Sequence, residues 1–168
     1  MLRLAIEVYD VSVAVHVMAA IVAFGPLFAF PLFIAVTEGR DPLSLPVVLR
    51  SVNTVERMVV VPATAVVGLT GVYQAIDGPF AFNRDEWMTV GFVLYLAVFG
   101  LVVLLVESRR AQAADEADRF LEEAHEEDDV VLSERYRDRM RVPNALMPAI
   151  GIVVLFVTYL MEVKPAAG

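Results

Sequence analysis

The sequence of 168 residues contains no cysteine, and Lys164 is the only lysine among its thirteen basic residues. The absence of cysteine excludes disulfides, thiolate metal sites and cysteine nucleophiles. A glycine-rich phosphate loop, a serine nucleophile elbow and an HExxH zinc motif are also absent. The formal net charge of -8 argues against nucleic acid as a partner. The preference for arginine over lysine is typical of GC-rich bacterial genomes.

Long apolar runs are what the sequence has in abundance: hydrophobic residues make up 58% of the chain, and its mean hydropathy is +0.66. A helix needs about 20 residues to cross a bilayer. Four runs qualify, at about 11–36, 58–76, 88–106 and 143–161. We therefore predict an all-α polytopic membrane protein, a bundle of four transmembrane helices that forms one domain over residues 1–168. Pro26 and Pro31 predict a bend or a broken inner end in the first span.

The distribution of arginine predicts how the chain is threaded through the membrane. Ten of the thirteen basic residues follow span one or span three, whereas Arg3, Arg84 and Lys164 belong to the other side. Loops rich in arginine and lysine stay in the cytoplasm. Both long loops are therefore expected in the cytoplasm of a bacterial cell, and both termini outside its inner membrane.

The two cytoplasmic loops are expected to be helical. "SLPVVLRSVNTVERM" predicts a short helix that is capped by Ser44 and lies along the membrane surface before the chain turns inward at Met58. Residues 107–142 predict an acidic helical hairpin that reverses near Asp128 to Ser133. At its base, Arg109 and Arg110 are expected near anionic lipid headgroups.

Two spans carry stripes of small residues at helical spacing, which let another helix approach closely. The stripe of span two consists of Thr64, Gly68, Gly71 and Ala75, and that of span one of Ser12, His16, Ala19 and Ala23. His16 therefore points toward protein rather than lipid.

His16 is the candidate functional residue, because ionisable groups at such depth are costly and usually face the bundle interior. One interpretation makes it an axial ligand of haem or of a metal. The other makes it a neutral side chain that is hydrogen-bonded to Tyr95 on span three or to Thr70 on span two, both at a similar depth.

A haem held by His16 has several candidates for its second ligand. Met88 and Met161 lie near the outer surface, a second copy of the chain could donate its own His16, and a five-coordinate haem needs none. The other histidine, His125, is too far out in the acidic loop. Glu122 and His125 have the spacing used in di-iron bundles, but the motif occurs once, in a solvated charge run, so no metal site is predicted.

Three segments carry a resemblance to a known family: "VHVMAAIVAFGPLF", "VPATAVVGLTGVY" and "YLMEVKP". Together they resemble small bacterial "predicted integral membrane proteins" of unknown function, which implies four spans and no established activity. Span one is also distantly similar to the membrane protoporphyrinogen oxidase of haem synthesis and to the copper-resistance D proteins. That similarity implies that His16 ligates haem b or a metal. The intramembrane lysine of the oxidase pattern has no counterpart here.

Two functional hypotheses follow, and neither decides whether the chain is an enzyme. In the first, the bundle binds haem b through His16 for a redox role, as a monomer or a homodimer. In the second, the protein is a cofactor-free accessory subunit of a membrane complex. Its small-residue stripes would then join a partner's helices, and its acidic hairpin would dock a soluble protein.

Overall fold

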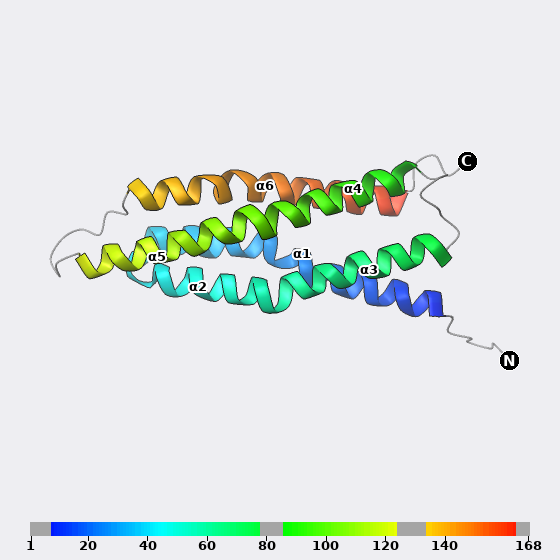
Figure 1. Ribbon diagram of the computed structural model, residues 1–168, viewed down its shortest axis with the longest axis horizontal. Helices are drawn as coiled ribbons and strands as arrows, with labels where there is room; N and C mark the ends of the chain where they lie inside the picture. Colours follow the sequence, from blue (N-terminus) through cyan, green and yellow to red (C-terminus); the bar gives the residue numbers. More distant parts are fainter. Residues whose placement is uncertain (1–7, 78–85, 124–133, 164–168) are drawn as a thin grey trace.

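The computed structural model describes residues 8–77, 86–123 and 134–163, which are helical almost throughout and contain no strand (Figure 1). The chain runs through α1 (Val8–Arg40), a 3-10 turn η1 (Pro42–Ser44), α2 (Leu45–Val55), a π-helical segment η2 (Glu56–Val60) and α3 (Val61–Asp77). It continues through α4 (Glu86–Leu101), a second π-helical segment η3 (Val102–Val106), α5 (Glu107–Glu123) and α6 (Glu134–Val163).

These elements join end to end into long helices. Among the described residues, four are long and apolar enough to cross a membrane: Val8–Arg40, Pro42–Asp77, Glu86–Arg119 and Glu134–Val163. The all-α membrane fold with four long apolar helices is thereby confirmed. A helix of 30 residues is about 45 Å long, whereas the hydrocarbon core of a bilayer measures about 30 Å. Each helix is thus longer than the apolar layer requires.

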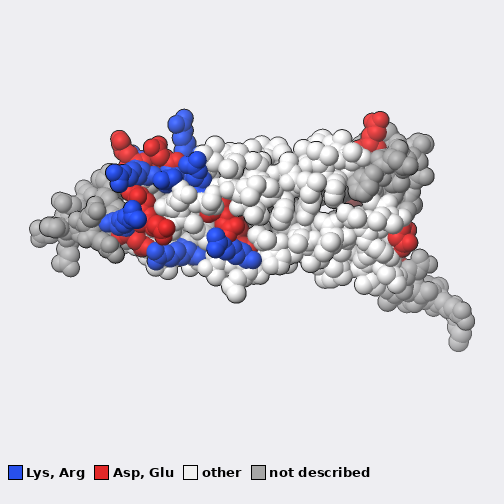
Figure 2. Space-filling model, in the orientation of Figure 1, with Lys and Arg blue, Asp and Glu red and all other residues white. Residues whose placement is uncertain are grey.

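The excess length carries the charge. Figure 2 shows arginine and acidic side chains gathered at one end of the bundle, beside a long apolar middle part, with a few acidic side chains at the opposite end. We call the described residues 37–57, 107–119 and 134–142 the charged end. There α2 packs on α5 and α5 on α6, whereas in the apolar part α1 packs on α3 and α4 on α6. The helices α3 and α4 contact each other little.

The prediction that the first loop lies along the membrane surface is wrong. The helix α2 continues through η2 into α3 without a turn at Met58, so it extends the bundle lengthwise (Figure 1). Its apolar face packs on protein: Leu45 and Leu49 share a core with Ile34 of α1, Ala113 of α5 and Met140 of α6. Ser44 precedes α2 but makes no capping hydrogen bond, because its hydroxyl donates to the Asp41 carboxylate instead.

Proline accounts for one of the π-helical segments. Pro62 has no N–H, and its ring would clash with the carbonyl four residues back in a regular α-helix. The preceding turn is wider, and the Val61 N–H donates to the Glu56 carbonyl five residues back. Pro26 and Pro31, which predicted a bend or a broken inner end, lie inside the continuous α1, so the helix is not broken there.

A buried ion pair joins α5 to the start of η2 in the charged end. Arg110 Nη1 donates to Glu56 Oε2 over 2.9 Å, and each side chain is 1% exposed. Its position in the sequence suggested that Arg110 contacts lipid headgroups, but its side chain is buried within the protein. Glu56 precedes the apolar run that starts at Met58, and burial raises the pKa of its carboxyl, while Arg110 opposes that rise. Beside the pair, Arg57 bonds to the carboxylate of Glu107.

Tyr136 of α6 belongs to the apolar core that contains Leu45 and Leu49. Its hydroxyl donates to Glu38 Oε1 near the end of α1. Burial and the adjacent carboxylate both raise the pKa of Tyr136, so the phenol stays protonated and remains a donor at physiological pH. The expected hairpin thus corresponds to α5 and the first turns of α6, packed against α1 and α2. Its reversal near Asp128 to Ser133 lies outside the described residues.

The buried pair yields a prediction about stability. Arg110→Met leaves the Glu56 carboxyl buried without its cation, so we expect the free energy of unfolding to fall by about 3–5 kcal/mol. The double variant Glu56→Met/Arg110→Met should recover most of this loss, because no charge is left unpaired. Denaturant unfolding in detergent micelles, followed by circular dichroism, measures both.

The control is Arg137→Met, at an exposed position of α6, which should change the free energy of unfolding by no more than about 0.5 kcal/mol. Equal stability of Arg110→Met and Arg137→Met would contradict the role assigned to the pair.

Candidate functional site

His16 lies in α1 and bonds to α3. Its Nδ1 is 2.9 Å from Thr70 Oγ1, and the Thr70 hydroxyl donates to the Val66 carbonyl oxygen over 2.7 Å. Since the hydroxyl hydrogen is used there, the hydroxyl oxygen accepts from the Nδ1–H of a neutral imidazole. This tautomer leaves the electron pair of Nε2 as an acceptor or as a possible ligand.

The structure brings His16 and Thr70 together but places Tyr95 elsewhere. The Tyr95 hydroxyl, from α4, donates to the Thr64 carbonyl oxygen of α3 over 2.8 Å. Gly68 makes room for it: a Cβ at that position would lie 2.6 Å from Tyr95 Oη. The Tyr95 ring stacks on Phe99, with ring centroids 6.3 Å apart. Tyr95 therefore links α4 to α3 rather than to the histidine.

The small-residue stripes make contacts within the chain. The two faces meet because α1 packs closely on α3. A Cβ on Gly71 would lie 3.5 Å from His16 Cε1. One turn further out, Gln74 Nε2 donates to the carbonyl oxygen and hydroxyl of Ser12, over 3.2 and 3.1 Å. Thr64, Ala75 and Ala23 are buried.

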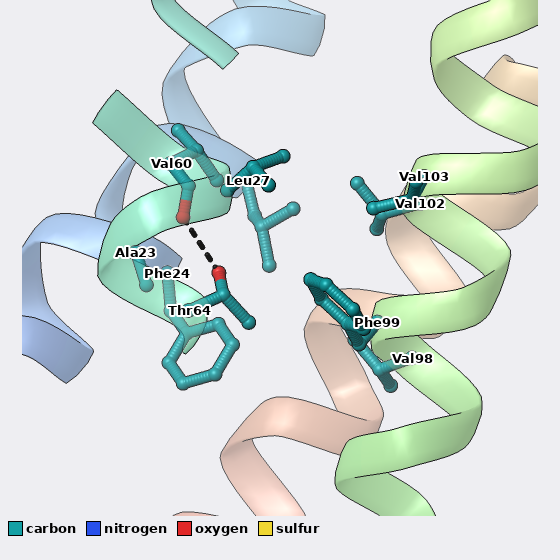
Figure 3. A pocket seen from close by; sticks show the side chains of 10 residues that line it. Ala23, Phe24, Leu27, Val60, Thr64, Val98, Phe99, Val102 and Val103 are labelled. Carbon is teal, nitrogen blue, oxygen red and sulfur yellow. Dashed lines mark hydrogen bonds between the residues drawn. The ribbon is translucent and has the colours of Figure 1, made fainter. Parts of the chain in front are cut away.

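A small cavity lies between α1, α3 and α4 in the apolar part (Figure 3). Its volume is about 20 Å³. Ala23, Phe24, Leu27, Val60 and Val61 line one side of it, and Val98, Phe99, Val102 and Val103 the other. The one polar side chain in its wall is Thr64, whose hydroxyl donates to the Val60 carbonyl oxygen. Such an apolar space has room for about one water molecule but offers it no set of partners.

These dimensions decide whether a haem fits inside one chain. Pockets for molecules of drug size have volumes of about 300–1,000 Å³, and the cavity in the apolar part is more than tenfold smaller and does not include His16. The imidazole itself fits the role of ligand, because its hydrogen bond to Thr70 fixes the ring orientation, as such bonds do for metal-bound histidines. The cavity in the apolar part does not fit the macrocycle of a haem.

A larger, polar cavity of about 290 Å³ lies between α2 and α5 in the charged end. One side of its wall is polar and comes from α2 and the start of η2. It consists of Arg50, Asn53, Thr54 and Arg57, at the i, i+3, i+4, i+7 spacing that aligns residues on one helix face. The α5 side consists of Ala111, Ala114 and Asp115. The Oδ1 of Asn53 is buried and has no hydrogen-bond partner in the part of the chain that the structure describes.

The sequence reasoning missed this groove and the buried pair beside it. Each residue was interpreted alone as a solvated loop charge or as part of an interfacial helix. A signal was present in the spacing: α2 carries a polar face next to an apolar one, and α5 places alanines three or four residues apart. Only the pairing of α2 with α5 converts those two faces into a cavity.

Two candidate residues of the acidic loop do not enter the site. His125 and the side chain of Glu122 lie outside the described residues. Within residues 8–77, 86–123 and 134–163, as far as they are described, no group of three or more histidine and acidic side chains is placed to hold a metal ion. Met88 is in the first turn of α4 and Met161 in the last turn of α6.

Comparison with known proteins gives one match. Residues 11–165 match a family described as "Predicted integral membrane protein (DUF2269)". Comparison with curated proteins gives no match, and neither does comparison with solved structures.

The contact between Gly68 and Tyr95 yields a second prediction. Gly68→Ala forces Tyr95 or α4 to move, so we expect a loss of about 1–3 kcal/mol in the free energy of unfolding. Removing the hydroxyl in Gly68→Ala/Tyr95→Phe should restore part of it. Gly71→Ala is the matched control, because its Cβ would make an ordinary contact with His16. Both glycine variants are compared by unfolding in detergent; equal effects would refute the close approach.

Proposed function

Since the chain belongs to this family of predicted integral membrane proteins, whose description names no activity, we propose from its structure that it is an accessory protein of a membrane complex. In this proposal the four helices form a rigid anchor and present the charged end to a soluble partner. The charged end lies in the cytoplasm of a bacterial cell and both termini lie outside the inner membrane. The distribution of ten of the thirteen basic residues over the two long loops supports that orientation.

One observation carries this proposal: the polar side chains in the apolar part join one helix to another. His16 bonds to Thr70, Tyr95 to the Thr64 carbonyl and Gln74 to Ser12. A catalytic site or a transport pathway needs polar groups that converge on a cavity. The cavity in this part is instead small and apolar. Polar side chains that bond one helix to another, rather than facing a cavity, favour a structural protein over an enzyme.

A charge reversal tests the interaction with a partner. The protein is purified from its native membranes after cross-linking, beside the double variant Glu134→Arg/Asp138→Arg, which changes two exposed acids one turn apart on α6. We expect the wild type to retain one stable partner with a basic surface. The variant should lose it, because the two new arginines repel that surface. Glu162→Arg, an exposed acid in the last turns of α6, is the control and should retain the partner.

Retention of the same partner by all three proteins would contradict docking through the charged end. Absence of any stoichiometric partner from the wild type would contradict the accessory role itself.

Haem b binding through His16 is the second candidate. The orientation of Nδ1–H toward Thr70 favours it, because Nε2 keeps its electron pair, and so does the resemblance of span one to the oxidase and copper-resistance groups. In this second proposal the haem lies between two copies, each providing its own His16, since the small cavity in the apolar part has no room for it. When bound, the group would supply one-electron redox chemistry.

The substitution His16→Ala separates the two candidates. Under the accessory proposal, purified protein from haem-replete cells shows no Soret band, and the variant loses about 1–2 kcal/mol in the free energy of unfolding through one lost hydrogen bond and a small void. A Soret band in the wild type that His16→Ala abolishes would overturn that proposal and establish haem binding.

A double-mutant cycle with Thr70→Val checks the structural role of the pair. We expect a coupling energy of about 0.6 kcal/mol between positions 16 and 70, the average for hydrogen bonds within membranes. Strictly additive effects would contradict the bond.

A further inference from the structure

The groove between α2 and α5 has the composition of a site for a phosphate group. Arg50 of α2 and Arg57 of η2 lie two helical turns apart, about 10 Å along the continuous helix, with Asn53 and Thr54 between them. Opposite them, the side chains of Ala111 and Ala114 are short and leave the space open. Asp115 also lines the groove, and Asp118 and Glu107 pair with the two arginines, so three carboxylates surround the two guanidinium groups. What the groove offers an anion is therefore not an excess of positive charge but the N–H donors that the two guanidinium groups still have available.

Both arginines can turn toward such a ligand. Their side chains are largely exposed, 59% for Arg50 and 66% for Arg57. Arg50 is paired with Asp118 and lies 3.7 Å from Asp115, and Arg57 is paired with Glu107. A guanidinium has five N–H donors, so each arginine can bind a phosphate oxygen while keeping its carboxylate partner. Exchange of that partner costs little only for Arg50, whose ion pair with Asp118 is solvent-accessible. Glu107 is 10% exposed and keeps Arg57 as its cation.

The surroundings of the groove distinguish a lipid from a soluble anion. Next to Arg57, the chain continues with Met58, which is 74% exposed, and Val59, which is also exposed. On the neighbouring helix, Leu104 is 72% exposed and comes three residues before Glu107. The polar groove thus opens directly beside apolar surface of the kind that faces acyl chains. Basic pockets at this level of membrane proteins bind lipid headgroups.

We propose that the groove between α2 and α5 is a binding site for an anionic phospholipid. The phosphodiester contacts Arg50 and Arg57, and the acyl chains lie along Met58 and Leu104. A hydroxyl on the headgroup would reach the polar wall at Thr54 and Asn53. This site is independent of the partner and of His16.

The test uses the full-length protein in nanodiscs and two lipids of equal chain length, phosphatidylglycerol and phosphatidylcholine. Native mass spectrometry after release from mixed nanodiscs gives the retained lipid. We expect retention of phosphatidylglycerol over phosphatidylcholine by the wild type. Arg57→Gln should weaken that preference about fivefold, the equivalent of about 1 kcal/mol for one arginine at a membrane surface. Arg137→Gln, at an exposed position outside the groove, should leave it unchanged.

A second variant keeps the charges and fills the space. Ala111→Leu places a larger side chain in the groove and should abolish the preference, whereas Ala149→Leu, on the exposed side of α6, should not. Helical content from circular dichroism is compared for all variants. An unchanged preference in both Arg57→Gln and Ala111→Leu would overturn the site.

Inorganic phosphate distinguishes the two sources of the anion. It is added to delipidated protein in detergent, and thermal unfolding is measured beside the same protein with phosphatidylglycerol. Stabilisation by the lipid alone supports the proposal. Equal stabilisation by inorganic phosphate, lost in Ala111→Leu, would overturn the lipid assignment and give the groove to a soluble anion.

Discussion

A polar group without water must find its partner inside the protein, and this constraint arranges the bundle. In the apolar part it sets which helices touch: His16 and Gln74 draw α1 against α3, and Tyr95 spans from α4 to the backbone of α3. In the charged end the same constraint acts on full charges, where Glu56 and Arg110 form an ion pair out of contact with water. Between these two polar levels the contacts are apolar, and the small cavity lies there.

The two π-helical segments lie at the boundary between these levels. Glu56 begins η2 and Glu107 directly follows η3. A π turn widens the helix by one residue, so the residues after the turn are rotated about the helix axis relative to those before it. Pro62 causes the π turn of η2, whereas no proline follows η3 in α5. The acidic residue at each segment is paired with an arginine: Glu56 with Arg110, and Glu107 with Arg57.

The sequence was sufficient for the spans because hydrophobic length is a property of each segment alone. Contacts between segments were harder to predict. The apolar face of α2 suits a lipid surface as well as a helix partner, and only the packing of Leu45 and Leu49 on α1, α5 and α6 decides between them. Arg110 follows Arg109 in the chain, yet one is buried and the other is not, because one residue rotates a helix by about 100°. The position of Thr70 along its span, at the same depth in the membrane as His16, was enough to predict their contact. Tyr95 has a similar depth, but depth does not show which way a side chain points, and Tyr95 bonds to the Thr64 carbonyl, further along α3.

The continuity of α2, η2 and α3 has a mechanical consequence. Residues Pro42–Asp77 form a helical length of 36 residues, about 54 Å from end to end, with no loop between the two sides of the apolar layer. Such a continuous helix is held along both halves, by α5 on α2 and by α1 on α3, so its two ends cannot move independently of each other. Together, α4, η3 and α5 form a second such helix, and α3 and α4 touch little. The two long helices meet where α2 packs on α5 and separate where α3 and α4 face each other, so the bundle is closed at the charged end and held together by α1 and α6 elsewhere.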